Sequence, residues 1–366
     1  MIKESYIKLG EFIEQCNERN INEYYGADEL RGINNEGNVM PSKANIIGVS
    51  FHTYKIAHKG YFIYNPARLD IGSISCLQEE VAIFSQMYVI FKIKEKCKNT
   101  LLTEYLWMWF KRKEFFRYVA FVNFGSVREM FTYEDMCNVM LPVPPIEEQR
   151  RIVSEYQTVE RRIANNEALI QKLEETAQAI YHHTFVEGID EENLPEGWRK
   201  GKLGEIVLFK VGGDRPAVYS ETLTNDCTVP IYSNGINKKG LYGYTNKAVV
   251  KDDSFTISAR GNVGTCFLRR KPYCGIVRLI SVIPCKSNLL YYLYFYLSSM
   301  NLQGDGSAQS QITVPQLEDE DVIIPNSTTL TKFQDEMTVV TNYIENTECE
   351  NSHLRTLLSL LTSKLS

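Results

Sequence analysis

Two long stretches of the chain place apolar residues, with a few polar interruptions, at steps that alternate between four and three. The first stretch has Ile152, Tyr156, Val159, Ile163, Asn166, Ile170, Leu173, Ala177 and Ile180. The second has Phe333, Met337, Val340, Ile344, Thr347, Asn351, Leu354, Leu358, Leu361 and Leu365. A sustained period of 3.5 is typical of helices that pair along a seam. We therefore predict two long helices that pack against each other; the alternative is that each packs on its own globular block.

The segments before the two helices carry a different pattern, in which strands and short helices alternate. Residues 62–64, 87–91, 255–257 and 276–283 are rich in β-branched and aromatic side chains, which predicts strands. The pattern predicts helices over residues 101–113 and 288–300. Each segment is therefore expected to fold as a mixed α/β block.

Four short motifs occur twice and in the same order, once in each block. Residues 8–11 recur at 202–205, residues 32–37 at 235–240, residues 67–73 at 259–265, and residues 139–142 at 322–325. Four matches in one order indicate a duplicated unit. The chain therefore runs block, helix, block, helix, and helices that pair in this order must be antiparallel.

The predicted fold class is α+β, with two mixed α/β domains joined by two long antiparallel coiled-coil helices in a pseudo-twofold internal repeat. The expected divisions are a first domain at residues 1–145, a first spacer helix at 146–187, a second domain at 188–326 and a second spacer helix at 327–366. A helix of about 35 residues is about 50 Å long, and this length is expected to separate the two domains.

Composition narrows the class of protein. The 366 residues are 44% hydrophobic and 23% charged, which suits two globular domains rather than a disordered chain. The longest strongly apolar stretch, within residues 289–300, is too short for a membrane span. Nine cysteines without a CxxC pair argue against a disulfide framework, and no histidine spacing suggests a metal site. We expect a cytoplasmic protein with no metal and no membrane contact.

The net charge of −5 is unevenly distributed. The acidic residues concentrate in the two predicted helices, whereas the block between the helices is weakly basic. An acidic total can therefore hide cationic surfaces on the blocks.

Enzyme motifs are missing or incomplete. Residues 65–68 begin like a loop of amino-methyltransferases but lack its second proline and its aromatic residue. Residues 235–240 have the glycines of a phosphate-binding loop without the lysine that follows them. No nucleophile elbow, metalloprotease or zinc-deaminase motif is present. Because both incomplete motifs lie in duplicated segments, the pattern favours recognition of a target with two parts over catalysis.

Double-stranded DNA is a target of this kind. Two similar recognition surfaces about one helical turn apart, roughly 34–36 Å, are how dimeric proteins contact two half-sites on one face of the duplex. Here the two blocks are covalently joined and differ in sequence. We therefore expect an asymmetric site of two different short sequences, separated by base pairs that are not read.

A distinctive motif, Leu-Pro-Val-Pro-Pro-Ile-Glu-Glu-Gln at residues 141–149, leads into the first helix. Residues 194–198 precede the second copy of the first repeated motif, and the strings at 64–68 and 257–261 occupy equivalent places in the two blocks. Together these features resemble the DNA-specificity subunits of type I restriction–modification systems over nearly the whole chain. The second helix departs from the family pattern, because residues 325–327 replace Pro-x-Pro-Pro and no Glu-Gln follows.

The resemblance implies two target-recognition domains on an antiparallel pair of spacer helices, with no catalysis by this chain. It also implies binding to double-stranded DNA together with two modification subunits, which carry S-adenosylmethionine and methylate adenine. ATP-dependent restriction subunits cleave unmethylated DNA in such systems, so ATP and Mg are expected on partners and no cofactor on this chain. Three alternatives stay open: a fused restriction–methylation enzyme, a self-contained bipartite DNA-binding regulator without methyltransferase partners, and a coiled-coil scaffold that does not bind DNA.

Candidate DNA-contacting residues lie in and beside the duplicated segments. Arginine can contact guanine or phosphate, and glutamine can contact adenine. The candidates are Arg68, Arg128, Asn234, Asn237, Lys238, Lys239, Arg260, Arg269, Arg270, Gln309 and Gln311. The alternatives are a salt bridge that shapes the turn at Arg68 and Arg260, and ordinary solvated loops or surfaces elsewhere. Gly72 and Gly264 are expected to serve backbone geometry or a close approach to DNA.

Asn166 and Thr347 interrupt the apolar seams near the middle of the two helices. In an antiparallel pair both would lie near the pseudo-twofold axis, where buried polar residues set the register at a cost in stability. We therefore expect the substitution Asn166→Leu to raise the melting temperature and to loosen the preferred spacing of the half-sites. The alternative is that both side chains face solvent.

Overall fold

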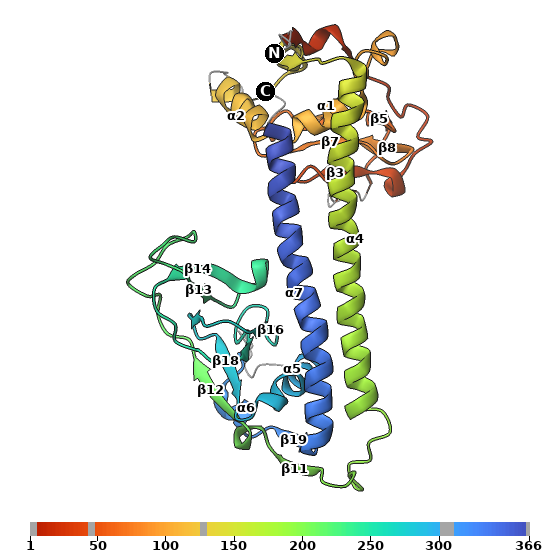
Figure 1. Ribbon diagram of the computed structural model, residues 1–366. Coiled ribbons are helices and arrows are strands. Elements are labelled where there is room, and N and C mark those ends of the chain that lie inside the picture. Colours follow the sequence, from red (N-terminus) through yellow and green to blue (C-terminus); the bar gives the residue numbers. More distant parts are fainter. Residues whose placement is uncertain (1–5, 43–47, 125–129, 301–310, 364–366) are drawn as a thin grey trace. The chain divides into compact units, whose positions relative to one another are not determined.

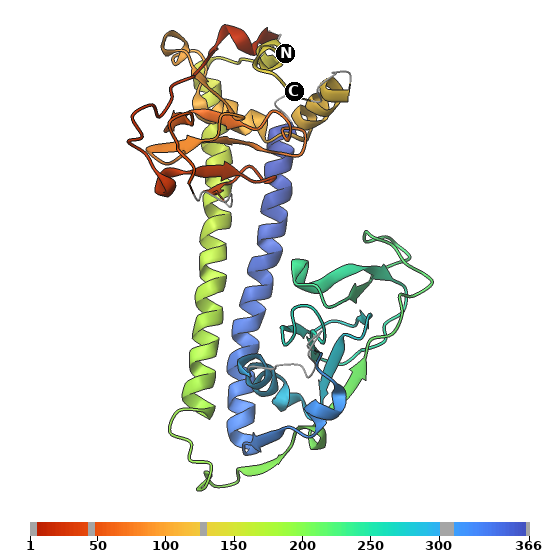
Figure 2. The same cartoon turned by 180° about the vertical axis from the view of Figure 1, so that it is seen from behind.

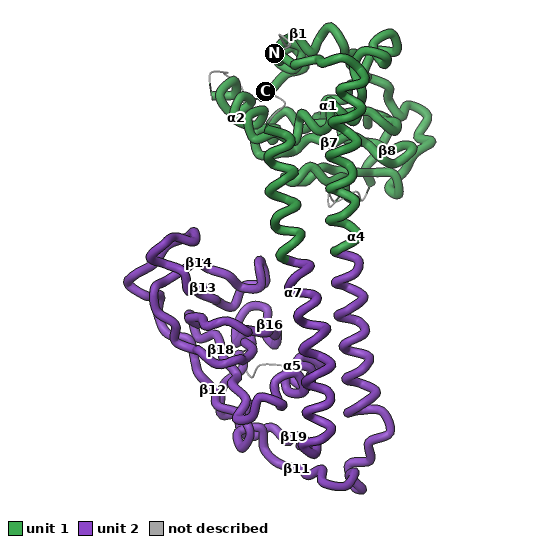
Figure 3. The backbone as a smooth tube through the Cα atoms, viewed as in Figure 1, with its two compact units in different colours: residues 1–166, 349–366 green, residues 167–348 purple. Residues whose placement is uncertain are grey.

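The computed structural model describes four stretches of the chain, residues 6–42, 48–124, 130–300 and 311–363. The chain forms two compact units (Figure 3): the first contains residues 1–166 and 349–366, and the second contains residues 167–348. Both long helices are divided between the units. Each unit therefore consists of one mixed α/β block and one segment of each helix.

The two long helices begin at the predicted residues. Helix α4 spans Ile146–Phe185 and helix α7 spans Ser327–Ser363. Within each unit the two helix segments lie side by side and antiparallel (Figures 1 and 2). All seam positions within the described stretches are buried or half-buried, so the period of 3.5 correctly predicted that helix packs against helix. None of the described helices is both long and apolar enough to cross a membrane.

The block of the first unit is built around a four-stranded sheet in the order β2-β9-β6-β7. Its strands are β1 (Tyr6–Lys8), β2 (Ile13–Gln15), β3 (Arg31–Ile33), β4 (Val39–Pro41), β5 (Lys55–His58), β6 (Phe62–Tyr64), β7 (Ile74–Cys76), β8 (Val81–Phe84), β9 (Val89–Ile93) and β10 (Met140–Pro142). Its helices, apart from the long ones, are α1 (Thr103–Phe110), α2 (Lys113–Phe124) and α3 (Tyr133–Asn138).

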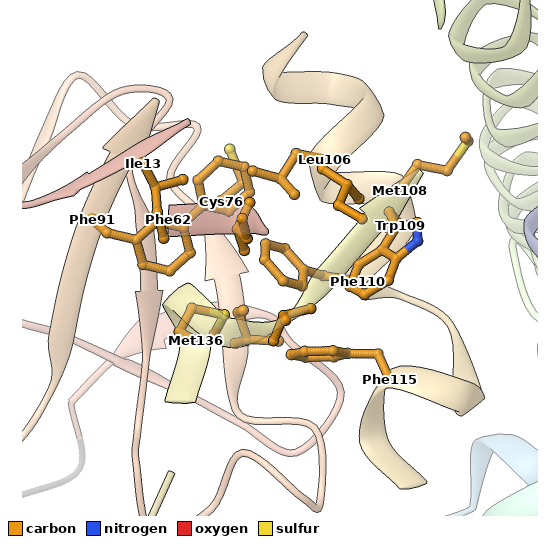
Figure 4. Close-up of a cluster of buried hydrophobic side chains, with 14 of the residues drawn as sticks. Ile13, Phe62, Cys76, Phe91, Leu106, Met108, Trp109, Phe110, Phe115 and Met136 are labelled. Atoms are coloured by element: carbon orange, nitrogen blue, oxygen red, sulfur yellow. The ribbon is translucent and has the colours of Figure 1, made fainter. Parts of the chain in front are cut away.

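Aromatic side chains fill the core between this sheet and α1 (Figure 4). Phe62 stacks on Phe91 with ring centroids 5.2 Å apart, and Phe110 of α1 packs edge-on against Phe62 at 5.6 Å. Val153 and Tyr156 of α4 belong to the same buried cluster. The first segment of α4 is therefore part of the core of this unit.

The second unit has a main sheet in the order β12-β18-β15-β16 and a smaller one in the order β14-β13-β17. Its strands are β11 (Arg199–Lys202), β12 (Val207–Val211), β13 (Val229–Tyr232), β14 (Leu241–Thr245), β15 (Ser254–Ile257), β16 (Cys266–Arg269), β17 (Cys274–Gly275), β18 (Ile280–Pro284) and β19 (Asp321–Ile324), and its shorter helices are α5 (Leu290–Ser299) and α6 (Val314–Glu318). Phe185 of α4 and Phe333 of α7 meet in its core with ring centroids 4.9 Å apart. Both long helices therefore stabilise this unit as well.

The repeated motifs have the same structural role in both units. The strand that ends at Lys8 or Lys202 pairs antiparallel with the strand formed by the fourth motif, β10 or β19. The second and third motifs lie against each other in both units, although through different atoms. The Ser73 hydroxyl of the third motif donates to the Ile33 carbonyl of the second motif at 3.2 Å, and the Ser258 hydroxyl, directly before the third motif, donates to the Asn234 carbonyl, directly before the second motif, at 3.4 Å. The two main sheets also share one strand order, since the last strand in the sequence lies second in each. The internal repeat is therefore confirmed.

One predicted strand, at residues 276–283, begins later than predicted, because its first four residues form a turn. The chain leaves β17 at Gly275 and enters β18 only at Ile280. In between, Val277 and Arg278 adopt positive φ angles of 54° and 60°. Two consecutive residues in the left-handed region form a tight turn that normally contains glycine, asparagine or aspartate. No turn signal is present in the sequence here, because the segment is largely apolar and β-branched and contains no glycine, asparagine or aspartate.

The glutamine that ends the proline-rich motif holds the start of α4 in place. Gln149 is fully buried, and its side chain accepts from the Leu102 amide at 2.9 Å and donates to the Thr100 and Pro144 carbonyls at 2.8 Å. Helix α7 lacks this glutamine and is capped by Asn326, whose side-chain oxygen accepts from the Thr329 amide at 2.9 Å. The motif is therefore explained by packing and hydrogen bonding within the chain.

The polar interruptions of the seams are buried. In the first unit Asn166 is 3% exposed, and its Nδ2 donates to Asn351 Oδ1 at 2.9 Å and to Glu350 Oε2 at 3.0 Å. In the second unit Thr347 is also buried and donates to the Tyr343 carbonyl of its own helix. The alternative that both side chains face solvent is therefore wrong.

Candidate nucleic-acid interface

In the second unit, the side chain of Asn234 holds three loops together. Its Oδ1 accepts a hydrogen bond from the Ala259 amide at 2.9 Å, and its Nδ2 donates to the Val277 carbonyl at 2.7 Å. Asn234 thus fixes its own loop, residues 233–240, against the loops at 258–265 and 276–279. Asn234 was predicted as a DNA contact, but both polar atoms of its amide already have partners. We therefore assign it a positioning role.

Each of the three loops carries an exposed cation: Lys238, Arg260 and Arg278. Asn237 is exposed beside Lys238. We call these four residues the three-loop face. Base edges and phosphates are the groups that such donors recognise on nucleic acid.

Gln311 positions Arg260. The Nε and Nη2 atoms of Arg260 donate to Gln311 Oε1 at 3.1 and 3.0 Å. The expected alternative, a salt bridge, is not what orients this arginine, since its partner is a neutral amide. Among the described residues no carboxylate pairs with Arg260, so Gln311 holds its guanidinium in place without neutralising its charge.

Arg269 is not a surface residue, and its prediction as a phosphate contact is wrong. It is 4% exposed and lies at the end of β16, with its guanidinium 3.6 Å from the centroid of the Tyr232 ring. It donates to Thr256 Oγ1 at 3.1 Å and to the Lys239 carbonyl at 2.7 Å. Burial lowers the pKa of this guanidinium below its usual value. Its role is to support the turn that carries Lys238.

Two further predicted cations pair with α7 inside the second unit. Arg270 Nη1 donates to Asn342 Oδ1 at 2.7 Å and lies 3.4 Å from a carboxylate oxygen of Glu345. Lys239 Nζ donates to Glu348 Oε1 at 2.6 Å. Because acidic residues of the helix compensate these charges, we leave both residues out of the three-loop face.

The first unit has a related arrangement around an asparagine at a different place in the repeat, just before the third motif. Asn65 Oδ1 accepts from the Ala67 amide at 3.1 Å, and Asn65 Nδ2 lies 4.0 Å from Met87 Sδ. Ala67 is the repeat equivalent of Ala259, and Met87 lies two residues before β9, as Arg278, the neighbour of Val277, lies two residues before β18. In both units an asparagine therefore joins the third motif to the turn before the equivalent strand. Arg68 is exposed, and no residue in the described stretches accepts a hydrogen bond from its side chain.

The two predicted glycines serve backbone geometry, as expected. Gly72 has a φ of 104° and Gly264 a φ of 83°. A Cβ atom at Gly72 would lie 2.2 Å from the Asn35 carbonyl oxygen, so only glycine allows the second and third motifs to touch. A direct approach of these glycines to DNA stays a prediction.

The remaining candidates, Arg128 and Gln309, lie outside the described residues. Two further residues, Arg278 and Met87, were not among the predicted contacts; they occupy the turns before β18 and β9. A signal for Arg278 was present, because it is the one charged residue in the apolar run at residues 272–285. Within the described stretches, no group of three or more histidine, cysteine or acidic residues is placed to hold a metal ion.

Comparison with known proteins agrees with this architecture. The family model of the type I restriction modification DNA specificity domain matches residues 7–175 and 195–356, once for each block with the helix that follows it. The chain therefore belongs to the type I restriction–modification DNA-specificity family. The specificity subunits of this family are non-catalytic.

Relatives match over parts of their length. A putative type I specificity subunit of Mycoplasma pneumoniae is 32% identical over 136 residues, which are 37% of this chain and 41% of that protein. A putative specificity subunit of the type I restriction enzyme MjaX from Methanocaldococcus jannaschii is 26% identical over 244 residues, 60% of this chain and 56% of that protein. The chain thus spans about half the length of these relatives.

The fold recurs in a solved structure. The crystal structure of the S subunit of a type I restriction-modification system from M. genitalium has a TM-score of 0.60 at 15% identity, covering 99% of this chain and 95% of that one. This likeness supports the predicted fold class of two mixed α/β domains with two long helices.

Proposed function

We propose that this chain is a non-catalytic DNA-specificity subunit that reads a bipartite, gapped and asymmetric site in double-stranded DNA. The observation that carries the proposal is the duplication of a loop arrangement whose exposed residues differ between the copies. The second unit presents Lys238, Arg260 and Arg278, whereas the equivalent loops of the first unit present Arg68 and Met87. Because different side chains contact different base edges, the two half-sites are expected to have different sequences.

The partners complete the proposed function. Two modification subunits would bring S-adenosylmethionine and methylate adenine, and restriction subunits would bring ATP and Mg. This chain would supply the sequence information that directs both to their site. The cytoplasm is the compartment in which such a complex meets the chromosome of a prokaryote.

Methylome sequencing tests this proposal. A host that expresses the chain with a cognate modification subunit should gain one methyladenine motif made of two unlike half-sites with a fixed gap. A host with the modification subunit alone should lack that motif. If complex formation is verified and no motif appears, the modification role is contradicted. Specific footprints from the isolated chain would then support the regulator without partners.

Helix α7 offers a surface for a protein partner. Val339 and Tyr343, one helical turn apart in the second unit, are 70% and 55% exposed. Exposed apolar residues at this spacing are typical of a helix that binds another helix. We expect the pair Val339→Glu and Tyr343→Glu to weaken binding of the modification subunit at least tenfold, because each change places a charge in an apolar contact.

The control adds the same charge elsewhere. Gln171→Glu and Thr176→Glu lie at exposed polar positions of α4 in the same unit, and they should leave the affinity unchanged. Affinity is measured by titration of labelled modification subunit, with circular dichroism to verify folding. Equal affinities for both double variants would show that this surface does not bind the partner.

A further inference from the structure

The turn at Val277 and Arg278 has a conformation that its residues disfavour. Both adopt φ angles in the left-handed region, and for a β-branched residue such as Val277 this is a true outlier. Glycine, asparagine or aspartate would form the same turn without strain. The residues at these positions are therefore not the ones that turn formation alone would favour.

Hydrogen bonds with three neighbouring residues hold the turn in this conformation. The Val277 amide donates to the Gly213 carbonyl at 2.8 Å, and the Arg278 amide donates to the Gly212 carbonyl at 2.9 Å. Asn234 donates to the Val277 carbonyl at 2.7 Å. A Cβ atom at Gly212 would lie 2.7 Å from the Gly275 carbonyl carbon, so the approach of this segment requires glycine. Strain that is held by its surroundings in this way is typical of functional positions.

The arginine on this turn is available to a ligand. Arg278 is exposed, and within the described stretches no acceptor for its guanidinium is present. Asn234 joins the turn of Arg278 by hydrogen bonds to the loop of Lys238 and to that of Arg260, so the three cations lie on connected loops. A fixed backbone reduces the conformational freedom that the side chain loses on binding.

We propose that Arg278 selects a guanine in the half-site that the second unit reads. The inference rests on the proposed function and names the residue and the base. The planar guanidinium matches the O6 and N7 acceptors of guanine in the major groove with two hydrogen bonds. The equivalent turn of the first unit carries Gln86 and Met87, so the other half-site has no counterpart of this contact.

The test uses the full complex with its modification subunits. Binding is measured on a set of duplexes in which each base pair of the wild-type motif is changed in turn. With Arg278→Gln, the preference for G·C at one position of one half-site should fall by about tenfold to a hundredfold. Preferences at the other positions should stay unchanged. The control is Arg199→Gln. Arg199 lies on β11 and forms an exposed ion pair with Glu205, so this variant removes the same charge and should leave every preference unchanged.

The outcomes separate the two proposals. If the wild-type complex selects no bipartite site, the proposed function fails. If it selects one and Arg278→Gln weakens all duplexes equally, Arg278 contacts phosphate and the inference is overturned; unchanged preferences overturn it as well. The variant Arg278→Gly is a control for misfolding. It should melt no lower than the wild type, since glycine tolerates this φ, and it should still lose the guanine preference.

Discussion

Replacing Gly72 by alanine is expected to destabilise the first unit by about 3 kcal/mol or more. Two effects add at this position. The φ of 104° is unfavourable for any residue with a Cβ atom, and that atom would overlap the Asn35 carbonyl oxygen at 2.2 Å. The loops of the second and third repeated motifs must then move apart, and Arg68 moves with them. The change should therefore also weaken binding to the half-site of the first unit.

Gly60→Ala separates the two effects. Gly60 also has a positive φ, 81°, but no atom lies within 4 Å of the position of an added Cβ. It should cost only about 1 kcal/mol from backbone strain. Unfolding in urea can be followed by tryptophan fluorescence, because Trp107 and Trp109 lie in the first unit. Equal losses for the two variants would show that the contact with Asn35 contributes nothing.

Asn166→Leu is expected to lower the stability of the first unit by about 1–3 kcal/mol. The structure thus reverses the sign predicted from the seam alone. Leucine would leave the side chain of Asn351, which is 2% exposed, buried without its partner on α4. An unsatisfied buried polar group costs more than the hydrogen bond contributes in the wild type.

The double variant Asn166→Leu with Asn351→Leu should be more stable than the wild type, because two apolar residues then meet in the seam. Thermal unfolding of the wild type, both single variants and the double variant gives the coupling energy between the two positions. A single variant that melts at or above the wild-type temperature would contradict the pairing. The wider expectation, that Asn166 and Thr347 set the helix register and that Asn166→Leu loosens the spacing of the half-sites, is tested by binding to duplexes with the gap altered by one base pair.

Features held by contacts between residues close in the chain were predictable from the sequence, and features held by distant contacts were not. Helices α4 and α7 were predicted because their stabilising contacts recur every 3.5 residues along the chain, so the pattern is local. The repeat was found because duplicated motifs retain the glycines and charged residues that their shared backbone geometry requires. Gly72 and Gly264 were correctly interpreted for this reason.

The role of each cation depends on contacts with residues that are distant in the sequence, so the local pattern could not predict it. Arg269 and Arg270 are neighbours in the sequence and look alike there, yet one is stacked on Tyr232 in the core and the other pairs with α7. Which face of β16 is buried depends on strands and a helix far away in the chain. Asn234 looked like an exposed loop residue, but its side-chain amide makes hydrogen bonds with residues 25 and 43 positions further on in the chain.

The sequence by itself determined the order of block and helix, the duplication and the family, because each depends on motifs of neighbouring residues or on their repetition along the chain. Only the tertiary structure decided which polar side chains remain exposed. That outcome depends on which distant segments meet: Asn351 pairs with Asn166, Glu348 with Lys239, and Gly212 and Gly213 with the turn that presents Arg278. Such pairings arise from packing in three dimensions, and the periodicity of the sequence does not predict them.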